Sequence, residues 1–250
     1  MRPEGFWSAV GFLTRLPIPA TPYNEDTVRR SMVWYPLVGL IIGVLVAGAS
    51  TLLQWVFPQA PLVVGVMTVA CWVALTGGLH LDGLADTLDA WVGGLGDRER
   101  SLAIMKDPHV GSSAVVWLCL FLLAKCAALT SIAATGQLSF ALILACSWSR
   151  LTSPWLFQLT PYVRAQGLGT GMQSAVSLRG CLALTAIVII VSLLCLPGSR
   201  ILWIAPVMAG LFVLGRTWML QRLGGTTGDT AGALIELSEL VFLLIFLATA

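Results

Sequence analysis

Three aspartates at helical spacing are the residues of this chain best placed to do chemistry. Asp82, Asp86 and Asp89 follow one another at intervals of four and three residues, directly after an apolar stretch. On a helix these intervals place the three carboxylates within an arc of about 60°. Carboxylates that share one stripe repel each other unless a cation neutralises them. The spacing therefore predicts a site for Mg²⁺ or Mn²⁺ that bridges to a phosphate. The alternative is that the acids mark the N-terminus of a helix, where they interact favourably with the helix dipole.

A second acidic group lies near the C-terminus. Asp229 ends a loop that is rich in glycine and threonine, and Glu236 and Glu239 follow on the same side of a predicted helix. Acids inside a membrane span are costly and usually face a polar interior or a site. The loop offers free backbone N–H groups at a helix start, which makes Gly228 a candidate phosphate contact, although glycine also ends ordinary helices.

Basic residues inside the apolar stretches are candidates for holding phosphates. Lys125 and Arg150 lie within predicted spans, and Arg216 lies near the cytoplasmic end of another. A cation buried in a span is a functional candidate, but each of these three can instead snorkel or pair with an acid. His80, two residues before Asp82, is a candidate proton acceptor or support for a metal ligand, and its alternative role is structural. The sequence leaves these alternatives open.

These residues belong to a chain that is built for a lipid environment. Hydrophobic residues make up 57% of the 250 and charged residues only 10%, against about 25% charged in a soluble domain. Apolar stretches long enough to cross a membrane occur at 34–57, 62–80, 112–134, 138–158, 180–198, 201–221 and 231–250. We therefore expect an all-α polytopic membrane protein with about seven spans and a single membrane-embedded domain over residues 1–250.

The positions of the basic residues predict the orientation of the spans. These residues gather in the N-terminal segment and around the connections near 81–111, 159–179 and 222–230, and they are absent from the turns at 58–61 and 135–137. We expect the N-terminus and the three connections in the cytoplasm, with the protein in the cytoplasmic (inner) membrane and the site facing the cytoplasm. The net charge of +2 excludes a nucleic-acid binder that works through a broad basic surface.

Two further expectations concern packing. Apolar residues between Phe6 and Leu13 predict a short amphipathic helix at the membrane interface. Small residues of the first span, including Gly39 and Gly43, permit close approach of another helix. That helix belongs either to the same chain or to a second copy in a dimer, and the sequence does not choose between the two.

Together these features indicate a membrane-embedded enzyme that uses a divalent metal to handle a phosphate ester or anhydride. A transporter is the rival class, because charged residues inside spans also mark ion pathways. The acids gather at one predicted level near the cytoplasm, whereas a pathway would spread them through the depth of the membrane. This clustering favours the enzyme.

Six motifs, in order along the chain, resemble those of the cobalamin synthases, the adenosylcobinamide-GDP ribazoletransferase family. They are the segments 12–19, 76–89 and 104–111, then Ser149-Arg150, then Tyr162, Arg164 and Gly167-Leu168-Gly169, and finally 224–229 with Glu236 and Glu239. His109 departs from the pattern, since arginine is expected there, so a phosphate contact at that position is weakened or supplied elsewhere. The aspartate motif also echoes that of the CDP-alcohol phosphotransferases, but only in part.

The resemblance implies that the cobinamide-phosphate moiety of adenosylcobinamide-GDP is transferred to α-ribazole or its 5′-phosphate, with GMP as the leaving group. Another membrane-embedded metal-dependent phosphotransferase and a transporter remain the alternatives. The expected cofactor is Mg²⁺, with Mn²⁺ as a substitute. The expected partners are the two substrates and the lipid bilayer, with room for a homo-oligomer and for other enzymes of late cobalamin biosynthesis.

This reaction suggests a role for each candidate residue. The catalytic residues are Asp82, Asp86, Asp89 and His80, and the hydroxyl proton goes to either Asp89 or His80. The expected metal ligands are Asp82, Asp86, Asp89 and Asp229, with Glu236 as a weaker candidate. The expected phosphate contacts are Arg15, Lys106, Arg150 and Gly228.

Overall fold

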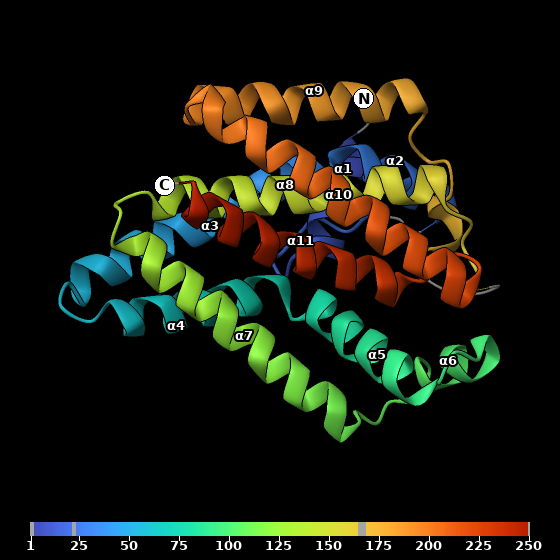
Figure 1. The fold of residues 1–250 in the computed structure, drawn as a ribbon. Helices are drawn as coiled ribbons and strands as arrows, with labels where there is room; N and C mark the ends of the chain where they lie inside the picture. The colour runs from blue at the N-terminus through green and yellow to red at the C-terminus, as the bar shows by residue number, and fades with distance from the viewer. Residues whose placement is uncertain (1–2, 22–23, 165–168, 250) are drawn as a thin grey trace.

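Helices form most of the chain in the computed structural model, which describes residues 3–21, 24–164 and 169–249 (Figure 1). Gly167 and Leu168, which belong to one of the motifs above, lie outside the described residues. The helices are α1 (Pro3–Leu13), α2 (Glu25–Ser31), α3 (Tyr35–Val56), α4 (Pro61–Thr76), α5 (Leu79–Gly93), α6 (Arg98–Ile104), α7 (Ser112–Ala133), α8 (Leu138–Leu159), α9 (Leu178–Cys195), α10 (Gly198–Leu223) and α11 (Gly228–Ala248), with short 3₁₀ turns at Met32–Trp34 and Thr170–Met172.

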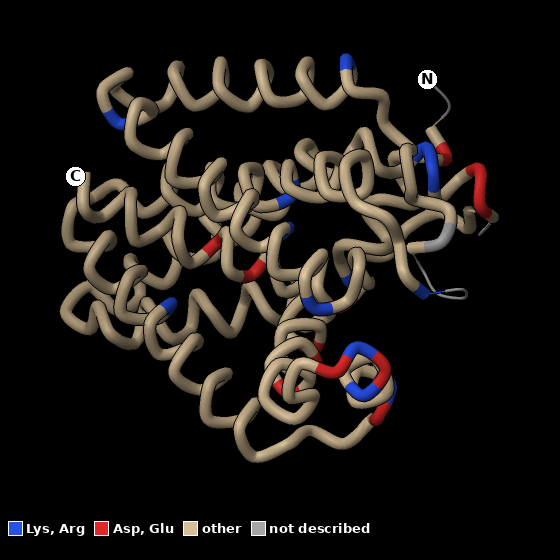
Figure 2. The backbone as a smooth tube through the Cα atoms, turned by 45° about the vertical axis from the view of Figure 1, so that its right-hand side comes forward, with Lys and Arg blue, Asp and Glu red and all other residues tan. Residues whose placement is uncertain are grey.

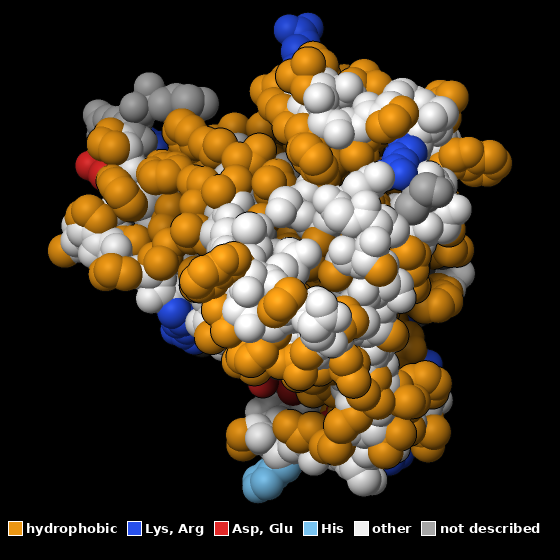
Figure 3. All heavy atoms as spheres, turned by 90° about the vertical axis from the view of Figure 1, so that its left-hand side faces the viewer, with side chains coloured by type: hydrophobic (Ala, Val, Ile, Leu, Met, Phe, Trp, Pro, Cys, Tyr) orange, Lys and Arg blue, Asp and Glu red, His pale blue; other side chains and the backbone are white. Residues whose placement is uncertain are grey.

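The seven predicted apolar stretches coincide with the helices α3, α4 and α7 to α11. Among the described residues, five helices are long and apolar enough to cross a membrane, and the bent pair α4–α5 would make a sixth span. Apolar side chains cover much of the face that Figure 3 shows. The all-α polytopic class is therefore confirmed, whereas the count of seven spans and the cytoplasmic N-terminus remain predictions.

The predicted span at 62–80 is wrong at its C-terminal end. Helix α4 ends at Thr76, and the chain turns by 95° before α5 begins at Leu79. Gly77 and Gly78 make this turn, each with a φ of +70°, a conformation that residues with a Cβ rarely adopt. His80 therefore lies in the first turn of the helix that carries the three aspartates, rather than at the end of a span.

The core of the bundle lies where α3 packs against α8. A Cβ atom added to Gly39 would lie 2.3 Å from the carbonyl oxygen of Cys146, and one added to Gly43 would lie 2.5 Å from the Cα of Ile143. Only glycine permits this approach of the two backbones. Gly39 and Gly43 therefore serve packing within the chain.

The predicted N-terminal helix is present as α1. Its residues Ala9, Val10 and Leu13 are buried in the main hydrophobic core, and α1 contacts α2 and α3. Just beyond it, the backbone N–H of Arg15 donates to the carbonyl of Leu75 at 2.8 Å. The N-terminal segment is thereby attached to the end of α4, beside the bend.

Helix α11 lies in the middle of the molecule and contacts α5, α7, α8 and α10 (Figure 1). It begins with a capping box in which Thr227 and Thr230 satisfy each other's backbone N–H groups. This cap fixes the first turn of α11, which carries Asp229.

Candidate active site

The two acidic groups of the sequence meet where α5 packs against α11. A Cβ atom added to Gly83 would lie 2.8 Å from the carbonyl oxygen of Asp229, and one added to Gly232 would lie 3.3 Å from the Cα of His80. Glycine on each helix therefore permits close contact of the two backbones. The first turns of α5 and α11 lie side by side as a result.

A cavity of about 100 Å³ opens at this contact. Four of the predicted site residues line it: His80, Asp82, Gly228 and Asp229. Aromatic side chains also line it, among them Phe12, Tyr35 and Phe157. The structure thus brings together residues that lie nearly 150 positions apart in the sequence, and we take this cavity as the candidate active site.

Asp86 and Asp89 lie on the same helix as Asp82, as predicted, but do not line the cavity. The charge of Asp86 interacts with those of Asp229 and Asp82, so it belongs to the same acidic region. Asp89 instead accepts a hydrogen bond from the backbone N–H of Gly111. Within residues 3–21, 24–164 and 169–249, no three His, Cys, Asp or Glu side chains converge as ligands of one metal ion.

Arg164 does not line the cavity, but it contacts Asp229, which does, and its residue type and position in the sequence do not predict this. Its Nη2 atom lies 2.5 Å from Oδ2 of Asp229 and donates to the carbonyl of Met105 at 3.2 Å. Its Nε atom is buried and makes no hydrogen bond within the described part of the chain. The sequence signal was weak, because Arg164 lies in a loop 65 residues before Asp229.

Two backbone hydrogen bonds hold the Arg164 loop against the glycine-rich loop. The N–H of Val163 donates to the carbonyl of Thr226 at 3.0 Å, and the N–H of Thr226 donates to the carbonyl of Pro161 at 2.8 Å. Tyr162 lies in the same loop, between Pro161 and Val163. Burial raises the pKa of its hydroxyl, while hydrogen bonds with backbone groups of Gly169 and Gly228 lower it. The loop that carries Arg164 is thereby fixed beside Gly228.

Two other predicted phosphate contacts, Arg15 and Lys106, lie outside the cavity. Arg15 is exposed, and its side chain covers Gly77 at the α4–α5 bend. Lys106 is exposed directly after Met105. His109 is also exposed, and its backbone N–H donates to Asp107, which lowers the pKa of that carboxyl group. Phosphate binding by Arg15 and Lys106 remains a prediction.

Charged residues also lie on helices inside the bundle (Figure 2). Lys125 of α7 lies 2.9 Å from Glu236 and also contacts Glu239, and Arg150 of α8 pairs with Glu239. All four side chains are buried. Glu236 therefore binds Lys125 and does not line the cavity as a metal ligand would, and Arg150 binds Glu239 instead of lining it as a phosphate contact. We assign both to this buried ion cluster, which joins α7, α8 and α11.

Replacing Lys125 by Met should destabilise the protein by about 3 kcal/mol, because two carboxylates would stay buried with one cation fewer. Thermal unfolding of the purified protein in detergent measures the effect. The exposed Lys106 is the matched control, and Lys106→Met should unfold at the wild-type temperature. A Lys125→Met variant as stable as the wild type would show that the cluster does not hold the helices together.

Comparison with known proteins agrees with the motifs. The model of the cobalamin-5-phosphate synthase family matches residues 5–247. Similar proteins named adenosylcobinamide-GDP ribazoletransferase include one from Ectopseudomonas mendocina, 48% identical over 94% of this chain and 95% of its own. One from Pseudomonas fluorescens is 46% identical (96% and 97%), and one from Stutzerimonas stutzeri is 47% identical (92% and 92%). No solved structure is significantly similar to the chain.

Proposed function

The chain belongs to the cobalamin-5-phosphate synthase family, and we propose that it performs the adenosylcobinamide-GDP ribazoletransferase reaction in the cavity between α5 and α11. The ribose 3′-hydroxyl of α-ribazole, or of its 5′-phosphate, attacks the phosphorus that carries the cobinamide. The bond from this phosphorus to the bridging oxygen breaks, and GMP leaves. The products are adenosylcobalamin, or its 5′-phosphate, and GMP.

One observation carries the placement of the site. His80 and Asp82 from one motif and Gly228 and Asp229 from another line the same cavity, although helices α6 to α10 separate them in the sequence. A pyrophosphate substrate needs its negative charge shielded before an oxygen nucleophile can approach. Acids for a metal ion, backbone N–H groups at a helix start and a base, held in one place, meet this need.

The cavity suits a Mg²⁺ ion that is shared with the substrate. Mg²⁺ in proteins commonly binds through one or two carboxylates and completes its shell with water and substrate phosphates. Asp82 and Asp229 line one cavity, so they supply such a pair without a third protein ligand. When bound, the ion neutralises charge on the phosphates. We propose Asp82 and Asp229 as its ligands, with Asp86 as a nearby charge.

His80 is the proposed acceptor of the hydroxyl proton. Its side chain lines the cavity, and its Nδ1 atom is buried with no hydrogen-bond partner within the described residues. Asp89, the alternative from the sequence, already accepts the N–H of Gly111 and lies outside the cavity. An imidazole nitrogen that is free to accept a hydrogen bond meets the geometric requirement for a base.

Arg164 is the proposed contact for a substrate phosphate. A guanidinium group binds phosphate in a bidentate manner and keeps its charge at any working pH. In the structure the guanidinium contacts Asp229, with Nε still unpartnered within the described part of the chain. We propose that Arg164 exchanges Asp229 for a phosphate when the substrate binds, which leaves Asp229 for the metal ion.

Release of GMP tests the proposed function directly. Purified protein in detergent is supplied with adenosylcobinamide-GDP and α-ribazole, with and without Mg²⁺. We expect GMP only when both substrates and the metal ion are present. Release that persists in the presence of a chelator would contradict the role of Mg²⁺ but keep the transferase. No release with Mg²⁺ or Mn²⁺ would contradict the transferase, and uptake of adenosylcobinamide-GDP into vesicles would then support a transporter.

A further inference from the structure

The outer edge of the bundle contains a second, larger cavity. Helix α9 lies there and packs mainly against α8 and α10 (Figure 1). A cavity of about 420 Å³ lies between these three helices, on the far side of α8 and α11 from the aspartates of α5. Its lining is almost entirely apolar, with Trp148, Leu151 and Trp155 from α8, Ile189 from α9, and Met208 and Phe212 from α10.

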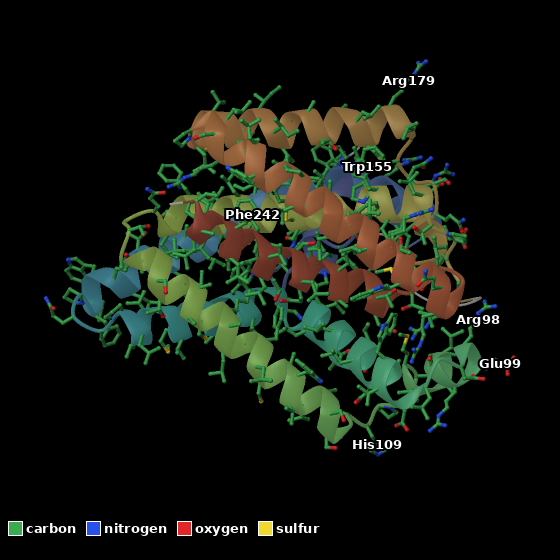
Figure 4. All side chains as sticks on the ribbon, viewed as in Figure 1. Arg98, Glu99, His109, Trp155, Arg179 and Phe242 are labelled. Carbon is green, nitrogen blue, oxygen red and sulfur yellow. The ribbon has the colours of Figure 1, made fainter. Side chains whose placement is uncertain are left out.

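Hydrogen bonds between α8 and α9 build the walls of this cavity. The indole N–H of Trp148 donates to Ser192, and that of Trp155 donates to Thr185, both at 2.9 Å. Figure 4 shows Trp155 in this region. The hydroxyls of Thr185 and Thr152, the two threonines of the lining, donate to carbonyls of their own helices. These donors are therefore engaged within the protein, and the cavity suits a hydrocarbon chain along its length.

One end of the cavity carries a positive charge. Leu159, the last residue of α8, lines the cavity, and its carbonyl accepts hydrogen bonds from Nη2 of Arg216 at 2.8 Å and from Nε at 3.3 Å. Among the described residues no carboxylate forms an ion pair with Arg216. The guanidinium is thus held beside the cavity by a backbone carbonyl, without an ion-pair partner in the part of the chain that the structure describes.

We propose that this cavity binds one phospholipid with an anionic headgroup. One acyl chain occupies the apolar cavity, and the phosphate of the headgroup contacts Arg216. A chain that spans a membrane meets such lipids as its solvent, and a basic residue near the membrane surface favours anionic ones. This proposal rests on α8, α9 and α10 alone and is independent of the proposed function.

Native mass spectrometry of the purified protein tests the acyl-chain position. The protein in detergent is mixed with phosphatidylglycerol and phosphatidylcholine that have the same acyl chains. The mass of the protein–lipid complex identifies the bound lipid. We expect one phosphatidylglycerol bound to the wild type. Ala209→Trp fills the cavity and should lower its occupancy at least about tenfold. Leu214→Trp, on an exposed part of α10 that does not line the cavity, is the control and should bind as the wild type does.

The headgroup contact has its own test. Arg216→Gln should lower the preference for phosphatidylglycerol over phosphatidylcholine about fivefold. Arg179→Gln, at an exposed side chain that points away from the bundle (Figure 4), should leave the preference unchanged. Equal binding of the two lipids by the wild type, or full occupancy in Ala209→Trp, would overturn the proposal. Ala205→Phe, from the same lining, replaces Ala209→Trp if that variant does not purify as folded protein.

Discussion

Replacing Asp82 by Asn should abolish GMP release while the protein still inserts into the membrane and purifies normally. Asp82 is exposed in the cavity between α5 and α11, so loss of its charge removes a proposed metal ligand without disturbing the core. Loss of a group that supports a bound metal costs roughly 10- to 100-fold, and loss of a ligand itself should cost at least that much. Turnover with saturating substrates at fixed Mg²⁺ measures the effect.

The matched control for this variant is Asp26→Asn. Asp26 is an exposed acid on α2, paired at 3.6 Å with Arg30, and such surface pairs contribute little to stability. It should retain wild-type turnover. More than about a tenth of the activity in Asp82→Asn would remove Asp82 from the metal site. If Asp229→Asn behaved as the wild type, the acidic group of α11 would be structural.

The elements that carry the site could be predicted because their signals are local. An apolar stretch about 20 residues long indicates a helix wherever it occurs, and the intervals between Asp82, Asp86 and Asp89 place them on one face of α5. The bend before α5 could not be predicted in the same way. Glycine also occurs inside an unbroken helix, as at Gly39 and Gly43 of α3, so its presence alone does not predict a bend. Only the backbone conformation of Gly77 and Gly78 reveals the turn of 95°.

The pairing of charges inside the bundle depends on depth as well as on helical phase. Glu236 shares a face of α11 with Asp229, but seven residues separate the two by about 10 Å along the helix axis. That distance carries Glu236 away from the cavity and to the level of Lys125 on α7. Helical phase puts Glu236 on the same side of α11 as Asp229, and the implied reaction made it a weaker candidate ligand. No sequence pattern shows which residue of α7 lies at its depth.

Arg164 was missed for a related reason. Its loop has no periodic pattern, and its contact with Asp229 depends on two backbone hydrogen bonds between loops that are distant in the sequence. Membership of a motif indicated that the position matters without indicating what it touches. The structure supplies that contact, and with it a prediction that separates two effects of one substitution.

Replacing Arg164 by Gln should weaken binding of adenosylcobinamide-GDP and strengthen binding of a metal ion to the substrate-free protein. The first effect follows from loss of a charged phosphate contact, which is worth about 1.5–3 kcal/mol and should raise KM at least about tenfold. The second follows because Asp229 loses the cation that occupies it. The affinity for Mn²⁺ is measured by titration, with the free ion quantified by its electron paramagnetic resonance signal. The Kd for Mn²⁺ should be lower in Arg164→Gln than in the wild type.

Arg164→Lys provides the matched comparison, because lysine keeps the charge but lacks the planar fork that binds phosphate in a bidentate manner. It should raise KM less than Arg164→Gln does and leave the Mn²⁺ affinity close to that of the wild type. A structural role for Arg164, in which it only anchors its loop to Met105 and Asp229, predicts a different pattern. Loss of the anchor would then weaken the substrate and Mn²⁺ together, so the direction of the Mn²⁺ change decides between exchange of partners and simple support.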